Sequence, residues 1–136
     1  MRRRKAREYA LQILFQIDFT GKNIDTENLE EFWSDKKENT DVKEFAEELV
    51  RGTINRLDEI DSIIERVVEN WILQRMAAVD RNILRFAVYE ILYRKDIPSA
   101  VTINEAIEIA KKFSSVEAAP FINGVLDRVA KEVGKA

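Results

Sequence analysis

Residues 80–92 read DRNILRFAVYEIL, and this stretch decides the fold. On a helix of 3.6 residues per turn, its apolar side chains occupy most of the circumference. They are Ile83, Leu84, Phe86, Ala87, Val88, Ile91 and Leu92. A helix that is apolar nearly all round must be covered by other elements on most of its sides. We therefore predict a central helix that opens at Asp80, inside an all-α protein.

The polar residues of this stretch are few, and its charged edge consists of Asp80, Arg81, Arg85 and Glu90. Charged side chains on a helix are most often solvated, so we predict that this edge faces water. A docking face for a protein partner is the alternative, because charged edges set specificity and association rate.

Apolar residues recur at three- and four-residue spacings on both sides of the central stretch. They predict helices at about residues 4–19 and 26–33, two within 41–71, one at 102–113 and a last one with Pro120 in its first turn. The polar segment 34–40 (SDKKENT) predicts a loop. Together these elements make about seven helices in one compact domain, residues 1–136.

Three short patterns predict helix ends. Gly21 supplies a stop for the first helix. Asp41 followed by Glu44 resembles a capping box, with Asp in place of Ser or Thr. The sequence from Thr102 to Glu105 has the Ser/Thr-x-x-Glu form of that box, and it predicts a helix that starts there.

The composition excludes several kinds of site. The 136 residues contain no Cys and no His, so thiolate nucleophiles, disulfides and the commonest general base and metal ligand are all missing. No phosphate-cradling Gly loop or nucleophile elbow occurs either. We predict that the protein is not an enzyme and has no metal or cofactor. Without a long apolar run or a signal peptide, the expected place is the cytoplasm, with no membrane partner.

The charge distribution points to a polyanion. The chain carries a net charge of −3, yet residues 1–7 hold five basic side chains and no acidic one. The remaining chain has 17 basic against 25 acidic side chains. A cationic cluster at a helix start opposes the helix macrodipole, which favours anions there. The phosphate backbone of a bound nucleic acid would stabilise cations at this helix start. The alternative interpretation is that the cluster is a solvated chain end with no ligand.

A second candidate lies near the carboxyl end. Lys111 and Lys112 precede Phe113, and an exposed aromatic ring beside lysines would suit stacking on an RNA base. The simpler interpretation, which we favour from the sequence alone, is that Phe113 is the last core residue of its helix.

Three stretches together resemble one protein family. They are RRRKAREYALQILFQIDF (residues 2–19), WILQRMAAVDRNILRFAVYEIL (71–92) and the pair VTINEAIEIAKKFSS (101–115) and PFINGVLDRVAK (120–131). The chain resembles the NusB family of bacterial transcription antitermination proteins nearly from end to end. The last pair is the most specific, because both of its motifs occur in the right order and separation.

The resemblance implies two small helical bundles and binding of boxA RNA from ribosomal RNA leaders. It implies a protein partner, the small-subunit ribosomal protein NusE. It also implies that the complex with NusE and boxA RNA assembles on RNA polymerase. The RNA-binding residues that it implies are Arg2, Arg3, Arg4, Lys5, Arg7, Lys112, Phe113, Glu117, Phe121, Asn123 and Gly124. The NusE-binding residues that it implies are Phe15, Asp80 and Arg81.

Two positions depart from the family pattern. Ser114 stands where many members have Gly, and Pro120 stands where many have Lys, which removes a phosphate contact. Two other functions remain open. One is an RNA-positioning domain related to that of RNA cytosine methyltransferases, although no cofactor-binding segment follows Ala136. The other is a protein-interaction or homodimerisation module in which the arginines take no part.

Overall fold

The computed structural model describes residues 2–21, 26–69 and 73–135, and every regular element among them is helical. The elements are α1 (Arg2–Thr20), α2 (Thr26–Trp33), α3 (Thr40–Asn55), α4 (Leu57–Val68), the short 3-10 helix η1 (Leu73–Arg75), α5 (Ala78–Tyr93), α6 (Ser99–Phe113) and α7 (Ala118–Glu132). The prediction of an all-α fold with about seven helices is confirmed. None of the described helices has the length and apolar character that crossing a membrane requires.

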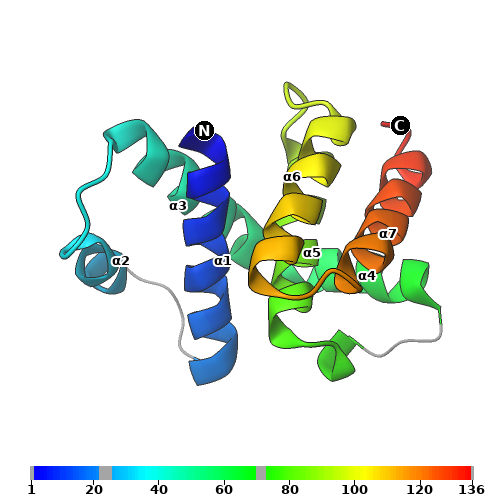
Figure 1. Cartoon of the computed structure of the whole chain (residues 1–136), viewed down its shortest axis with the longest axis horizontal. Helices are drawn as coiled ribbons and strands as arrows, with labels where there is room; N and C mark the ends of the chain where they lie inside the picture. The colour runs from blue at the N-terminus through cyan, green and yellow to red at the C-terminus, as the bar shows by residue number, and fades with distance from the viewer. Residues whose placement is uncertain (1, 22–25, 70–72, 136) are drawn as a thin grey trace.

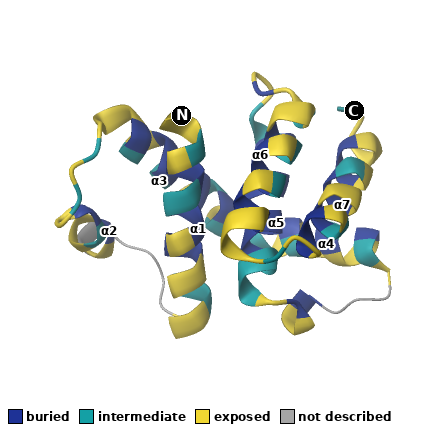
Figure 2. Cartoon of the chain, viewed as in Figure 1, coloured by how far each residue is buried: buried dark blue, intermediate teal, exposed yellow. Residues whose placement is uncertain are grey.

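The helices form two groups around α5. Figure 1 shows α1, α2 and α3 on one side and α4, α6 and α7 on the other. Helix α5 contacts α1, α3, α4, α6 and α7, so it belongs to the core of both groups. Phe86, Ala87 and Val88 at its middle are fully buried, and Figure 2 shows α5 as largely buried. The predicted central helix is confirmed, since its apolar circumference is covered on nearly every side.

The ends of α1 and the break between α3 and α4 follow local signals. Helix α1 stops before Gly21, which has a φ of +71° and donates its N–H to the carbonyl of Ile17 at 2.8 Å. Residues 41–68 form two helices as predicted, because the chain leaves helical geometry at Arg56 (φ −124°). Trp71, which the sequence places at the end of this segment, lies outside the described residues.

Both predicted capping boxes are wrong. Helix α3 begins at Thr40 with Asn39 as its N-cap, and α6 begins at Ser99, directly after Pro98. Thr102 therefore lies inside α6, where it is buried and donates its hydroxyl to Glu90 at 3.0 Å. Side chains that suit a helix cap were taken by tertiary partners instead, so the local pattern did not decide where the helix starts.

We expect alanine at two helical glycines to change stability in opposite directions. A Cβ at Gly52 would lie 2.1 Å from Cε1 of Tyr89, whose half-buried ring also stacks on Tyr93, so Gly52→Ala should cost about 1–3 kcal/mol. A Cβ at Gly124 would meet nothing within 4 Å, so Gly124→Ala should stabilise by up to about 1 kcal/mol. Urea unfolding of both variants measures this, and a Gly52→Ala protein as stable as its parent would contradict the close approach.

Candidate nucleic-acid interface

The five cations at the start of α1, called here the basic tip, are Arg2, Arg3, Arg4, Lys5 and Arg7. Their positions around the helix separate them. Arg2, Arg3 and Lys5 are exposed, Arg4 is half-buried and Arg7 is buried with 2% of its surface accessible. The tip is therefore not one uniform cationic patch. Among the five cations, Arg2, Arg3 and Lys5 are the ones whose charge an external ligand can readily reach.

Arg7 belongs to the core. Its Nε and Nη2 donate to the two carboxylate oxygens of Glu90 on α5, at 2.7 and 2.8 Å. Glu90 is fully buried and also accepts the hydroxyl of Thr102. This corrects two predictions: Arg7 is not an exposed cation, and Glu90 is not on a solvated edge. Arg7 shares the face of α1 that carries Ala10 and Leu14, and that face packs towards α5.

Arg4 joins α1 to α6. Its Nε and Nη2 donate to Glu105 at 2.9 and 2.7 Å, a two-pronged pair that only the planar guanidinium forms. The Arg4 hydrogen bonds hold the pKa of the Glu105 carboxyl below its ordinary value, against the opposing effect of burial. Arg4 therefore has a structural role between the two helical groups, in addition to any contact with a ligand.

The exposed cations of the tip have carboxylate partners from the segment before α3 and from α3 itself. Arg2 pairs with Asp41 at 2.8 Å, and Lys5 pairs with Glu38 at 2.6 Å. The bonds from Lys5 and Tyr9 lower the pKa of Glu38. Arg3 instead lies over the ring of Phe45, with its Cζ 4.6 Å from the ring centroid. Among the described residues, Arg3 is the one tip cation without an ion pair.

The end of α6 lies beside α1. Lys112 donates to Glu8 at 3.0 Å, one turn beyond Arg4 on α1 and two turns beyond Glu105 on α6, so the two helices run side by side in the same direction. Phe113 is exposed to 36%, and the Nζ of Lys112 lies 5.2 Å from its ring centroid. The interpretation of Phe113 as a core residue is thus corrected. A cation and an open aromatic face lie next to each other at this edge, which we call the α1–α6 edge.

The remaining predicted RNA-binding residues lie around the start of α7. Glu117, Asn123 and Gly124 are exposed and Phe121 is half-buried. Helix α7 packs on α6 but not on α1 in the part of the chain that the structure describes, so these residues reach the basic tip only across α6. The structure thus brings Lys112 and Phe113 close to α1, and it places the α7 residues one helix further away.

Of the residues predicted to bind a protein partner, Phe15 is the most available. Its ring stacks on that of Phe19, with 6.5 Å between centroids and 4° between planes. Both rings belong to the apolar residues that recur along α1, yet they are exposed to 37% and 83%. Phe19 was missed as a surface residue because periodicity alone does not say which part of a helix its neighbours cover.

Arg81 is engaged within the protein. Its Nε and Nη2 donate to Asp18 of α1 at 2.9 and 2.7 Å, and Asn82 donates to the same oxygen at 3.0 Å. Burial opposes ionisation of Asp18, but these hydrogen bonds outweigh it and lower its pKa. Asp80 Oδ1 is buried and has no hydrogen-bond partner among the described residues. The sequence analysis did not single out Asp18. The available signal was its position as a single acidic residue among the apolar residues at the end of α1.

The predicted solvated edge of α5 is therefore mostly internal. Arg85 is nearly buried and forms a two-pronged pair with Asp61 of α4, both bonds being 2.9 Å. Together with the pairs of Arg81 and Glu90, this bond connects α5 to helices on both sides. The charged residues of α5 lie on the helix as predicted. They face neighbouring helices, however, where the sequence predicted that they face water.

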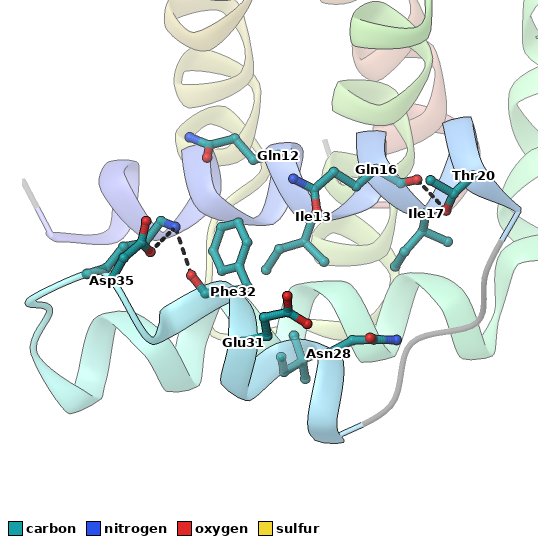
Figure 3. A pocket seen from close by; sticks show the side chains of 11 residues that line it. Gln12, Ile13, Gln16, Ile17, Thr20, Asn28, Glu31, Phe32 and Asp35 are labelled. Carbon is teal, nitrogen blue, oxygen red and sulfur yellow. Dashed lines mark hydrogen bonds and ion pairs between the residues drawn. The ribbon is translucent and has the colours of Figure 1, made fainter.

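A groove of about 480 Å³ lies between α1 and α2, on the flank of α1 that faces away from α6. Gln12, Gln16 and Asn28 line it with amides, and Glu31 and Asp35 line it with carboxylates, as Figure 3 shows. Lys36 donates to the Phe32 carbonyl at 2.8 Å and to Asp35 at 3.1 Å, so its charge is already engaged. Its acidic and amide lining does not favour phosphate, so we place the nucleic-acid interface at the tip and the α1–α6 edge.

Comparison with known proteins agrees with this architecture. The NusB family matches residues 4–131. A transcription antitermination protein NusB from Thermodesulfovibrio yellowstonii is 51% identical over 97% of this chain and 93% of its own length. The NusB protein of Myxococcus xanthus is 46% identical over 98% of this chain and 97% of its own length.

Solved structures give the same result. T. maritima NusB superimposes with a TM-score of 0.86 at 45% identity, covering 96% of this chain and 91% of that one. A chain from a complex of the antitermination factors NusB and NusE with dsRNA has a TM-score of 0.86 at 32% identity, covering 96% and 97%. With sequence and fold matching over nearly the whole length, the chain belongs to the NusB family.

Proposed function

We propose that this protein is a transcription antitermination factor that binds boxA RNA of ribosomal RNA leaders together with NusE. In this role it acts in the cytoplasm, without catalysis, as part of an antitermination complex on RNA polymerase. The whole chain serves as one RNA-binding unit. The observation that carries the proposal is the placement of Arg2, Arg3 and Lys5, three exposed cations in the first turn of a helix, where the macrodipole disfavours cations and an external phosphate can reach them.

The side chains at the α1–α6 edge are better suited to binding single-stranded RNA than a duplex. Arginine and lysine side chains of the tip can neutralise phosphates, and the open ring of Phe113 can take a stacked base beside Lys112. Gly124, exposed within α7 and touching nothing, gives a backbone or base room to approach closely.

The partner surface that we propose for NusE lies at the other end of α1. The stacked, exposed rings of Phe15 and Phe19 form an apolar patch there, and such rings are typical anchors of protein interfaces. Asp80 at the start of α5 adds an acidic group whose buried oxygen lacks a partner within the described chain. A chain solved in a complex of NusB and NusE with dsRNA shares the fold of this protein, which supports partners of these two kinds.

Fluorescence anisotropy tests the proposal directly. A labelled boxA RNA and a scrambled RNA of the same composition are titrated at two salt concentrations, with and without purified NusE. We expect boxA to bind more tightly than the scrambled RNA, and NusE to increase that preference. Equal affinity for both RNAs, unchanged by NusE, would contradict the proposed function.

A further inference from the structure

Two of the three exposed cations of the basic tip, Arg2 and Lys5, are already held by carboxylates of the same chain. We propose that Glu38 and Asp41 act as internal competitors of RNA phosphate, which an incoming RNA must displace from Lys5 and Arg2. We call these two residues the screening carboxylates. This inference rests on the proposed RNA-binding function and adds a device that weakens the tip for polyanions in general.

The geometry of the two pairs is that of a phosphate contact. The Lys5 Nζ lies 2.6 Å from Glu38, and Arg2 Nη1 lies 2.8 Å from Asp41, which are charge-assisted hydrogen-bond distances. The carboxylates come from outside α1: Glu38 precedes α3 and Asp41 lies in its first turn. They therefore meet the tip only because α3 packs against α1 in the folded protein.

Exposure divides the ion pairs of the tip into two classes. The Arg2 and Lys5 side chains are 68% and 56% accessible, so a ligand can reach them beside their partners. Asp41 is itself 56% accessible, so its pair with Arg2 contributes little to folding and exchanging it for a phosphate costs little. Glu38 is only 8% accessible, so it holds Lys5 more firmly and is the stronger competitor of the two. The Arg7–Glu90 pair, accessible to 2% and 0%, is closed to such exchange. Both screening carboxylates are thus placed to compete with phosphate for a cation that a ligand can reach.

Other contacts hold the screening carboxylates in position when the pairs are exchanged. Glu38 accepts the hydroxyl of Tyr9 at 2.5 Å, and burial together with Glu38 raises the pKa of Tyr9 to about 12, so this donor stays protonated. Asp41 accepts the backbone N–H of Val42 at 3.0 Å. Gln at 38 and Asn at 41 keep a carbonyl oxygen for both bonds, so Glu38→Gln and Asp41→Asn remove the charge while keeping the local structure.

The consequence is an offset in affinity. RNA of any sequence must displace the screening carboxylates to use Arg2 and Lys5, so binding through the tip alone is weakened. An RNA that also contacts the α1–α6 edge, or that contacts a bound partner protein, gains binding free energy that offsets this loss. The screening carboxylates weaken the binding of boxA RNA and of other RNA by the same factor. They therefore lower both affinities without changing the ratio of the affinity for boxA to the affinity for another sequence.

The test measures the affinity of scrambled and boxA RNA for Glu38→Gln, Asp41→Asn and the double variant. We expect each single variant to bind both RNAs up to about fivefold more tightly, and the double variant about tenfold. Glu65→Gln on α4, which does not contact α1, removes one negative charge as each single variant does, so it is their matched control and should change affinity by less than about twofold. Equal gains in the control, or no gain in the double variant, would overturn the proposal.

A second arm separates direct competition from a general field. In an Arg2→Ala/Lys5→Ala background, the screening carboxylates have no cation to occupy, so their substitution should leave RNA affinity unchanged. The same gain in both backgrounds would refute direct competition. Thermal unfolding of the Asp41→Asn variant should stay within a few degrees of its parent background, because its pair is exposed on both sides. Glu38→Gln keeps the carbonyl oxygen that accepts the Tyr9 hydroxyl, so this variant should also remain folded.

A third arm keeps this inference separate from the proposed function. Elution from heparin–agarose probes the tip with a sulfated polyanion and needs no RNA sequence. If the parent binds neither RNA but both single variants elute at higher salt than Glu65→Gln, the proposed function fails and the screening inference stands. If the single variants and Glu65→Gln elute together, the screening inference fails whatever the RNA result.

Discussion

Glu90→Gln is expected to destabilise the protein by about 3–5 kcal/mol, although it changes only one oxygen to an amide. The carboxylate of Glu90 is fully buried and receives two hydrogen bonds from Arg7 and one from Thr102. Without its charge, the buried guanidinium of Arg7 keeps only the longer contact of 3.8 Å with Glu105, which is already hydrogen-bonded to Arg4. Urea unfolding followed by circular dichroism measures the loss.

Two controls define this result. Glu132→Gln removes a carboxylate from the exposed pair with Arg66, so it should change stability by less than about 1 kcal/mol. Replacing both members of the buried pair, as Arg7→Met with Glu90→Leu, should recover much of the loss, because no unpaired charge remains. A Glu90→Gln protein within about 1 kcal/mol of its parent would show that the pair is not closed to water.

Replacing Arg2, Arg3 and Lys5 together with alanine should weaken RNA binding roughly ten- to a hundredfold at low salt and leave the fold intact. Each phosphate contact on a single strand contributes about −0.7 to the dependence of log affinity on log salt, so the slope should become shallower by about 2. All three side chains are exposed, and stability should change by less than about 1 kcal/mol. Anisotropy titrations across a salt series measure both quantities.

The matched control removes the same charge elsewhere. Arg51, Arg66 and Lys131 are exposed on α3, α4 and α7, and each forms an ion pair at the surface. Their replacement with alanine should reduce RNA affinity only slightly, through net charge. An unchanged salt slope in the tip variant, or an equal loss in this control, would remove the tip from the RNA interface.

Sequence periodicity predicted the helices better than their ends. The apolar circumference of residues 80–92 was enough to place a central helix, because no other structure buries such a pattern. Helix starts were less predictable. Thr102 and Glu105 have the residue types of a capping box, yet they bond to Glu90 and Arg4 from other helices. A cap is a local choice that a stronger distant partner can override.

The candidate site was predicted in its composition but not in its accessibility. The five cations of the tip are adjacent in sequence, but the partners of Arg7 and Arg4 lie 83 and 101 residues further along the chain. Which cation is buried depends on which face of α1 meets α5 and α6. The screening carboxylates could not be anticipated for the same reason, since Glu38 and Asp41 stand in an ordinary acidic segment.

The sequence by itself determined that the protein is helical, that α5 is its centre, and that a cationic cluster opens its first helix. These properties follow from periodicity and composition, which act through neighbouring residues. Only the tertiary structure decided that Arg7 and Glu90 form a buried pair, that Phe15 and Phe19 face outward, and that carboxylates hold Lys5 and Arg2. Burial and charge pairing depend on distances between helices, and those distances exist only when the chain has folded.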